Sequence, residues 1–493
     1  YVRSLFTMKQ NDNTSTSSRR SFIKKAAAGA ASVFIVPRHV LGGPGYTAPS
    51  DQINLAAIGA GGKGASDIRN AAASGNVIAL CDVDFSGSAS RSVERFPDAT
   101  LYNDYRVMLD EEPDIDAVTI STPDHTHAPA AVYAMERGVH VYVQKPMTHN
   151  IREARMLTEM AREQQIVSQM GNQGASNALL DMVQGWVDSG VLGEISKVQV
   201  WTNRPVWPQG VAMPEPAPDQ KPDDLHWDLW LGPAAQRAYT PDLHPSKWRG
   251  WVDFGTGALG DVGCHLIDIP FRTLDLMYPT DAECSVGTMY TGMWDAAYHP
   301  EGFPPSSFIT LHFDATDKSQ SPIEMTWSDG GIRPAHPAAI PADHDIGGPG
   351  SANGVLIIGE RGVISTNIND SSPLMPKLYL NDGTTEFGPE EENPEEPEYG
   401  HQRKWVDACK AGFDSPEHRA LTSSFDYAGP MTETVLMGNL AIRSAMLRRE
   451  DSDGDMEYYG RKKLLWDGEN MRITNFEAAN RFVGRTYRDG WTV

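Results

Sequence analysis

An aspartate and a histidine four residues apart form the pair in this sequence that best suits acid–base chemistry. Asp261 and His265 follow a glycine-rich stretch, and a helix over residues 260–274 would place both side chains on one face. Histidine titrates closest to neutral pH, so His265 could accept the hydroxyl proton of a secondary alcohol while hydride leaves the carbon. Asp261 could hold the imidazole or bind the substrate hydroxyl directly. An ordinary pair on a helix surface would have the same spacing.

A lysine could complete this group. Lys145 follows an apolar stretch of strand character, residues 139–143, and precedes Pro146. Its ammonium group could stabilise the alkoxide character that develops on the reacting oxygen. Lys145, Asp261 and His265 are therefore candidates for a catalytic group that also contacts the substrate.

A glycine-rich turn indicates a dinucleotide cofactor. Residues 53–58 form a short apolar run, and Gly59, Gly61 and Gly64 then occupy the three glycine positions of G-x-G-x-x-G. The first glycine permits a tight turn, the second lets a pyrophosphate approach the backbone, and the third permits close helix packing. A helix over residues 65–74 would direct its N-terminal amides at the phosphates.

An acidic residue after the next apolar run, residues 77–81, favours NAD over NADP. Asp82 lies 18 residues beyond Gly64, where a carboxylate can accept hydrogen bonds from the ribose hydroxyls and repels a 2′-phosphate. Capping of a following helix is the alternative role for Asp82. The residues expected to contact the cofactor are Gly59, Gly61, Gly62, Lys63, Gly64, Asp82, Thr122, Pro123, His125, His127 and Lys145.

Strand and helix patterns continue to alternate along the N-terminal half. Residues 117–121 and 139–143 are of strand character, and residues 129–137 between them are of helix character. This alternation predicts a doubly wound parallel sheet, in which ligands bind beyond the carboxyl ends of the strands. Thr122 and Lys145 both lie at such ends.

Together these segments resemble the glucose-fructose oxidoreductase, inositol dehydrogenase and MocA (Gfo/Idh/MocA) family. The resemblance implies an α/β fold, with an N-terminal Rossmann dinucleotide-binding domain and a C-terminal α/β domain. The sheet of the second domain would be largely antiparallel and open, would face the substrate, and often serves subunit association, so a homo-oligomer is expected. The motifs that carry the resemblance are residues 59–64, Asp82, residues 121–127, Lys145-Pro146 and residues 260–265.

The resemblance also implies roles for single residues. Lys145 matches the catalytic lysine of a Glu-Lys-Pro motif, and His265 matches the usual base. With this resemblance we predict that Lys145, Asp261 and His265 are catalytic and contact the substrate. A cis peptide bond is expected between Lys145 and Pro146. Gln144 stands where the family usually has glutamate, so the negative charge next to the lysine is lost.

The chain is expected to have three parts. Residues 1–50 are a twin-arginine export signal and linker, because Arg19-Arg20 precedes an apolar stretch too short to span a membrane. A disordered basic tail is the alternative. Residues 51–173 are the NAD-binding domain. Residues 174–493 are the substrate-binding and association domain, with a long C-terminal helix and a tail. The export signal implies a periplasmic or exported protein, soluble and free of the membrane after export.

Charge and composition exclude several classes of partner. The formal net charge of −23 opposes binding to nucleic acid or to an anionic membrane, because phosphate surfaces would repel it. A neutral small molecule suits the chain better. The four cysteines show no spacing typical of zinc sites or disulfides. His125 and His127 lack a third ligand at a suitable spacing, so we expect no bound metal.

Aromatic and polar residues that could bind a carbohydrate are concentrated between residues 201 and 251. Flat indole faces suit the C–H faces of a sugar, and amide and guanidinium groups can bind its hydroxyls. Packing in a core explains any one tryptophan equally well. The residues expected to contact substrate in this stretch are Trp201, Asn203, Arg204, Trp248 and Arg249.

The function expected from these features is hydride transfer between a secondary alcohol of a sugar, glycoside or polyol and a tightly bound nicotinamide cofactor. Tight binding is expected because free NAD is absent outside the cytoplasm. Two alternatives stay open. One is an NAD-dependent glycoside-cleaving enzyme that oxidises C3 transiently and then eliminates the leaving group. The other is a non-catalytic sugar-binding relative, which Gln144 suggests.

Overall fold

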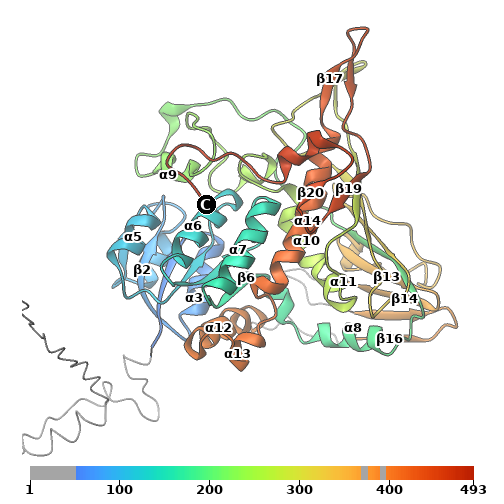
Figure 1. Ribbon diagram of the computed structural model, residues 1–493, viewed down its shortest axis with the longest axis horizontal. Coiled ribbons are helices and arrows are strands. Elements are labelled where there is room, and N and C mark those ends of the chain that lie inside the picture. The colour runs from blue at the N-terminus through green and yellow to red at the C-terminus, as the bar shows by residue number, and fades with distance from the viewer. Residues whose placement is uncertain (1–51, 368–375, 389–395) are drawn as a thin grey trace, which may run out of the picture. The chain divides into compact units, whose positions relative to one another are not determined.

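The computed structural model describes residues 52–367, 376–388 and 396–493 of the chain (Figure 1). The export signal expected over residues 1–50 lies outside these ranges and stays a prediction. Of the helices within the described ranges, none is long and apolar enough to cross a membrane. Residues 53–493 form one unit that holds two large sheets.

Six parallel strands form the N-terminal sheet, in the order β3-β2-β1-β4-β5-β6. The order reverses between β1 and β4, and ligands bind at such a reversal in open α/β sheets. The predicted dinucleotide-binding fold is therefore confirmed. The strands are β1 (Asn54–Ile58), β2 (Asn76–Cys81), β3 (Thr100–Tyr102), β4 (Ala117–Ile120), β5 (His140–Gln144) and β6 (Ser168–Gly171).

Helices bury both faces of this sheet, which explains why its strands are apolar throughout. Successive residues of β1 point to opposite faces: Leu55 packs with Ile68 of α3, whereas Ala56 belongs to the cluster that contains Leu157 of α7. The helices of this half are α3 (Lys63–Ala71), α4 (Ser90–Arg95), α5 (Tyr105–Glu111), α6 (Asp124–Met135) and α7 (Ile151–Glu163).

The sequence pattern predicted that this helix starts at Pro129. Helix α6 in fact begins five residues earlier, at Asp124. A proline within a helix cannot donate to the carbonyl four residues earlier, which here belongs to His125. The guanidinium of Arg485 donates to that carbonyl instead, at 2.6 Å. The helix therefore tolerates Pro129 because a residue from the far end of the chain supplies the missing donor.

The second sheet has ten strands in the order β16-β15-β14-β13-β7-β12-β11-β8-β19-β20. β7 and β12 pair in parallel, and the other neighbours pair antiparallel, so the expected largely antiparallel sheet is confirmed. Its strands are β7 (Ile195–Trp201), β8 (Asp281–Val286), β11 (Ser307–Phe313), β12 (Ile323–Ser328), β13 (Gly354–Gly359), β14 (Gly362–Thr366), β15 (Lys377–Leu380), β16 (Thr385–Phe387), β19 (Leu464–Asp467) and β20 (Arg472–Ile473).

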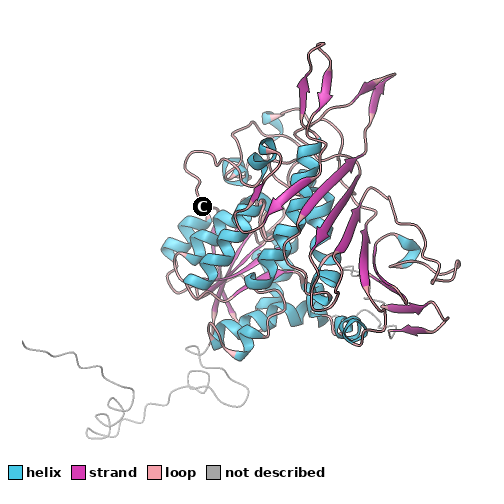
Figure 2. Ribbon diagram, turned by 45° about the vertical axis from the view of Figure 1, so that its right-hand side comes forward, coloured by secondary structure: helices cyan, strands magenta, loops and turns pink. Residues whose placement is uncertain are grey.

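Two short hairpins extend from this half of the chain (Figure 2). One carries Met293 and Trp294 in its turn, and both side chains are exposed. The first hairpin consists of β9 (Tyr290–Gly292) and β10 (Asp295–Ala296), and the second of β17 (Arg448–Glu450) and β18 (Met456–Tyr458).

The helix expected over residues 260–274 is divided in two. α10 (Gly257–Leu266) ends before α11 (Asp268–Thr273), because Pro270 has no amide hydrogen to donate to the carbonyl of Leu266. α14 (Phe425–Ala445), the long helix expected in the C-terminal part, packs against α7, α10 and β8 and so lies between the two sheets (Figure 1). Two further helices of this half are α8 (Leu179–Asp188) and α9 (Trp227–Leu231).

Helices α12 (Glu396–Ala411) and α13 (Pro416–Arg419) return to the N-terminal sheet (Figure 1). Trp405 and Cys409 of α12 are buried in the same hydrophobic cluster as Leu55 of β1. A segment of the C-terminal half thus completes the core of the dinucleotide-binding fold. The domain boundary at residues 173 and 174 stays a prediction.

Candidate active site

The glycine-rich turn joins β1 to α3 at the carboxyl edge of the parallel sheet. Gly59 has a φ of +79°, and a β-carbon there would lie 2.8 Å from the carbonyl carbon of Ser121. A β-carbon at Gly64 would lie 1.8 Å from the carbonyl oxygen of Gly59. Only glycine fits at either position, so the turn has the close packing that the motif predicts.

Asp82 lies beside this turn, at the end of β2. Its Oδ2 accepts a hydrogen bond from the amide of Gly61 at 3.0 Å, and its Oδ1 accepts one from the amide of Asp84 at 2.9 Å. Each carboxylate oxygen has a second lone pair that a ribose hydroxyl could use. The turn, the helix N-terminus and this carboxylate therefore fit a dinucleotide.

The segment between β7 and α10, residues 202–256, reaches over to the end of β2. The amide of His226 donates to the carbonyl of Val83 at 3.0 Å, and Nε2 of His244 lies 3.0 Å from Oδ2 of Asp84. Burial would raise the pKa of Asp84, but the interaction with His244 and the hydrogen bonds from the amides of Ser88 and Gly87 together outweigh burial and lower that pKa. We call residues 202–256 the covering segment.

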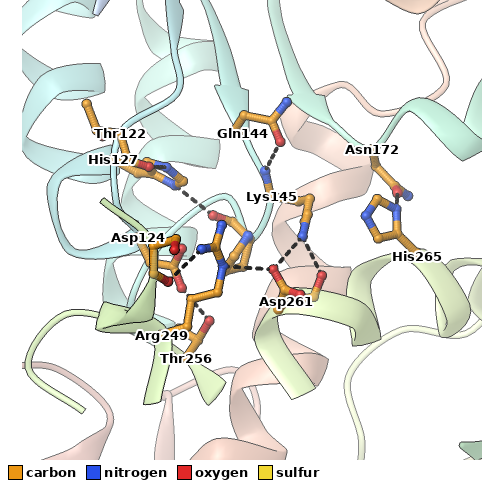
Figure 3. A network of polar contacts seen from close by, with 12 residues as sticks. Thr122, Asp124, His127, Gln144, Lys145, Asn172, Arg249, Thr256, Asp261 and His265 are labelled. Atoms are coloured by element: carbon orange, nitrogen blue, oxygen red, sulfur yellow. Dashed lines mark hydrogen bonds and ion pairs between the residues drawn. The ribbon is translucent and has the colours of Figure 1, made fainter. Parts of the chain in front are cut away.

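Lys145, Asp261 and Arg249 form a charged cluster where β5 ends (Figure 3). Nζ of Lys145 lies 3.0 Å from Oδ1 of Asp261 and also donates to the backbone carbonyl of Asp261. Nε of Arg249, from the covering segment, lies 3.1 Å from the same Oδ1. The side chains of Lys145, Asp261 and Arg249 are 14, 19 and 29 % exposed, so a substrate could reach them.

The charge of Asp261 is stable in this setting. Burial would raise the pKa of its carboxyl group, but the positive charges of Lys145 and Arg249 outweigh burial and hold that pKa well below its usual range. The peptide bond between Lys145 and Pro146 is cis, as the resemblance implies.

His265 lies one helical turn after Asp261 and is buried. Its Nδ1 is 2.8 Å from Oδ1 of Asn172, the residue that follows β6 (Figure 3). The sequence pattern suggested Asp261 as the holder of this imidazole, whereas Oδ1 of Asp261 is shared by two cations. Asn172 was not among the predicted site residues. Its position directly after a strand of the parallel sheet could have indicated it, because ligands bind beyond these strand ends.

Asp124 and Thr256 connect the two halves behind this cluster. Oγ1 of Thr256, just before α10, donates to Oδ2 of Asp124 at 2.6 Å. Burial raises the pKa of Asp124 to about 6, against the lowering effects of Thr256 and of the positive charges of Arg249 and Lys145. This carboxyl group therefore titrates near neutral pH.

His125 and His127 lie inside α6 and support loops. The ring nitrogens of His127 lie 2.9 Å from the carbonyl of Pro146 and 2.8 Å from that of Thr122, so this side chain links two ends of parallel strands. Nε2 of His125 lies 3.0 Å from the carbonyl of Trp230 in the covering segment. Burial lowers the pKa of His127 to about 4 and that of His125 to about 3.

Two tryptophans expected to contact the substrate are buried instead. Trp201 is 1 % exposed, packs with Ile340 and Leu356, and donates from Nε1 to the carbonyl of Ser351. Trp248 is 4 % exposed and belongs to the core of the covering segment. Neither indole face is open to a sugar, because each is covered by other side chains.

Three other residues expected to contact the substrate have different positions. Arg249 joins the Lys145 cluster. The amide of Asn203 donates to Oδ1 of Asn353, and the carbonyl of Arg204 accepts from Gly330. Trp207, which the sequence analysis did not select, is only half-buried and lies 5.9 Å from the guanidinium of Arg249. Its side chain is more accessible than those of Trp201 and Trp248.

Comparison with known proteins supports the fold of both halves of the chain. Residues 53–172 match the Gfo/Idh/MocA oxidoreductase family in its NAD-binding Rossmann fold, and residues 176–283 match the C-terminal α/β domain of the same family. Levoglucosan dehydrogenase of Pseudarthrobacter phenanthrenivorans is 25% identical over 199 residues, 39% of this chain and 40% of the relative. A glycosyl hydrolase family 109 protein of Shewanella baltica is 31% identical over 204 residues, 36% of this chain and 44% of the relative.

Each of these alignments thus covers less than half of the curated relative. The solved structure of an inositol dehydrogenase homolog from Azotobacter vinelandii, complexed with NADH and myo-inositol, superposes with a TM-score of 0.52 at 18% identity. That superposition covers 79% of this chain and 95% of the other. At this identity the likeness concerns the fold alone.

Proposed function

Since this chain belongs to the Gfo/Idh/MocA oxidoreductase family, we propose that it oxidises or reduces a secondary alcohol of a sugar, glycoside or polyol with a tightly bound NAD. The observation that carries the proposal is the placement of Lys145, Asp261 and His265 at the carboxyl edge of the parallel sheet, which also carries the glycine-rich turn. The substrates named for the relatives, levoglucosan and inositol, are of this class.

The side chains of this site suit proton transfer. Oδ1 of Asn172 accepts a hydrogen bond, so Nδ1 of His265 carries the hydrogen and Nε2 carries the lone pair that accepts a substrate hydroxyl proton. Asp261 holds the ammonium group of Lys145, which would stabilise negative charge on the substrate oxygen. Bound NAD would supply the hydride acceptor.

Two features support NAD and its retention. Asp82 and Asp84 place negative charge at the end of β2, which disfavours the 2′-phosphate of NADP. The covering segment is fastened over the same strand end through His226 and His244. A dinucleotide in the turn would then be enclosed at its adenosine end, which slows its dissociation.

The proposal is tested on the purified protein. Denaturation should release NAD, and a panel of sugars, polyols and glycosides should include one that changes nicotinamide absorbance. His265→Ala should lower kcat by roughly 10²- to 10⁴-fold because it removes the base. His336→Ala, at an exposed loop histidine, is the matched control and should leave kcat unchanged. Full activity of His265→Ala would refute the role of this imidazole.

The 31% identity to a glycosyl hydrolase family 109 protein favours a second candidate, glycoside cleavage through transient oxidation. The same cluster could serve both reactions, because each begins with removal of a hydroxyl proton and a hydride. A chromogenic glycoside distinguishes them. Cleavage releases the chromophore without net accumulation of reduced cofactor, whereas a dehydrogenase accumulates reduced cofactor and leaves the glycosidic bond intact.

The non-catalytic alternative rested on Gln144. Nζ of Lys145 nevertheless lies 3.0 Å from Oδ1 of Asp261, and this contact supports a catalytic role for the lysine without a neighbouring glutamate. Association into a homo-oligomer also stays a prediction, and light scattering on the purified protein would test it.

A further inference from the structure

A buried carboxylate with no part in the proposed chemistry lies under the active site. Asp67 of α3 has no exposed surface. Its Oδ2 accepts hydrogen bonds from Oγ of Ser121 at 2.9 Å and from Nε2 of Gln144 at 2.7 Å, and its Oδ1 accepts one from Nε2 of Gln402 at 2.9 Å. These donors come from the end of β4, from β5 and from α12, so one side chain connects three segments to the helix that follows the glycine-rich turn.

The chemistry of Asp67 determines how Gln144 is oriented. An ionised carboxylate only accepts hydrogen bonds, so the amide nitrogen of Gln144 has to face it. The amide oxygen of Gln144 is thereby directed to the backbone amide of Lys145, at 3.3 Å. A β-carbon at Gly171 would lie 2.6 Å from Nε2 of Gln144, so the neighbouring strand also leaves room for this arrangement.

A glutamate at position 144 would conflict with Asp67. Two carboxylates at the observed separation of 2.7 Å, both buried, could not ionise together. An aspartate at position 67 is therefore compatible with glutamine at position 144 and incompatible with an ionised glutamate there.

We propose that Asp67 is a positioning residue for Lys145: through Gln144 it fixes the backbone from which the catalytic lysine extends, and it does so from the helix that binds the cofactor. This inference rests on the proposed function for the role of Lys145. The link to the cofactor turn is direct, because Nζ of Lys63 lies 3.9 Å from Oδ1 of Asp67.

Burial has the largest effect on the pKa of Asp67, which is raised overall. Burial raises the pKa of this carboxyl group, and the charge of Lys63 together with the donors Ser121, Gln144 and Gln402 opposes that rise. Such a group is expensive to bury, so a purely apolar contact would stabilise the fold more simply. Its presence under Lys145 supports a positioning role.

The experiment compares the variants Asp67→Asn, Gln144→Glu and the double variant in the full-length protein. Two kinds of measurement are made: the kinetic constants kcat and KM on the substrate found in the panel, and the rate of Lys145 acetylation by acetic anhydride, followed by mass spectrometry. The second readout needs no substrate, so it tests the positioning of Lys145 even where the proposed function fails.

Asp67→Asn should lower kcat by about tenfold with little change in KM, and should change the acetylation rate of Lys145 by about threefold or more. Gln144→Glu should show larger effects because it brings two buried carboxylates together. The double variant has one carboxylate and one amide again, and should recover to within about threefold of the wild type.

Gln402→Leu is the matched control, because it removes a hydrogen bond to Asp67 on the side away from Gln144. It should lower the unfolding temperature and leave Lys145 acetylation unchanged. A purely structural role would give a different pattern: Asp67→Asn would lower the unfolding temperature while kcat and Lys145 acetylation stayed at wild-type values. That result, or a double variant no better than Gln144→Glu, would overturn the inference.

Discussion

The imidazole of His265 is held by Asn172, whose Oδ1 lies 2.8 Å from Nδ1. The two residues are 93 positions apart and come from different halves of the chain. Asn172 follows the last strand of the parallel sheet, and His265 lies on α10. The contact therefore aligns the proposed base with the edge of the sheet where the cofactor would bind.

Replacing this amide should affect catalysis more than stability. Asn172→Leu has a similar volume but cannot fix the tautomer, so kcat should fall by roughly 10- to 100-fold. Asn172→Asp should retain the contact and favour the charged imidazole, which moves the acid limb of the pH–rate profile upward. Rate profiles of both variants check this. An unchanged limb in Asn172→Asp would show that this contact does not control the base.

The features that the sequence predicts are those for which the backbone alone sets the requirement. The glycines of the turn are identifiable because Gly59 needs a positive φ and Gly64 has no room for a side chain. Asp82 is identifiable because it ends a strand at a fixed distance from that turn. The order of parallel strands, and with it the position of Lys145, follows from the same alternation of strands and helices.

The contacts between distant segments were not predictable in this way. Asn172 and Gln402 are single amides without a local pattern, and only the folded chain brings them to His265 and Asp67. The pairing of Asp261 with Lys145 also depends on how the two halves meet. Trp201 resembled a sugar-binding residue because the loop that covers it, around Ile340 and Ile346, has no strand or helix pattern.

The tight packing of the glycine-rich turn predicts that alanine is harmful at Gly64 and harmless at Gly185, a glycine outside the turn. A β-carbon at Gly64 would overlap the carbonyl oxygen of Gly59, and backbone cannot easily move aside. Gly64→Ala should lower the free energy of unfolding by about 1–3 kcal/mol and reduce the NAD content of the purified protein. Denaturant unfolding and assay of released NAD measure both effects.

Gly185 provides the control for that substitution. It lies at an exposed position of α8, and a β-carbon there would meet only open space, so alanine should be accommodated. Gly185→Ala should raise the free energy of unfolding by up to about 1 kcal/mol, because alanine favours helix over glycine. Equal NAD content in both variants would contradict the role assigned to Gly64.

Asp261 should not produce the acid limb of the pH–activity profile. Although burial opposes ionisation, Lys145 and Arg249 hold its pKa well below the usual range, so it stays charged wherever the enzyme works. Asp261→Asn should lower kcat/KM by roughly 10- to 100-fold at every pH, because the ammonium of Lys145 loses its partner. The acid limb should persist in this variant, with its midpoint unchanged or at lower pH, because a negative charge that interacts with His265 is removed. Disappearance of the limb would assign it to Asp261.

Asp124 should make the protein less stable as the pH rises toward neutrality. Burial raises its folded-state pKa to about 6, whereas an unfolded aspartate titrates near pH 3.9. Between these values the folded state keeps a proton that the unfolded state has lost, so the free energy of unfolding falls as pH rises through this window and is level above it.

Asp124→Asn removes this titration and retains an oxygen that can accept from Thr256. Relative to wild type, the variant should therefore gain about 3 kcal/mol between about pH 4 and pH 7, measured by urea unfolding at several pH values. A difference that is constant with pH would mean that Asp124 is ionised as readily in the folded protein as in the unfolded chain.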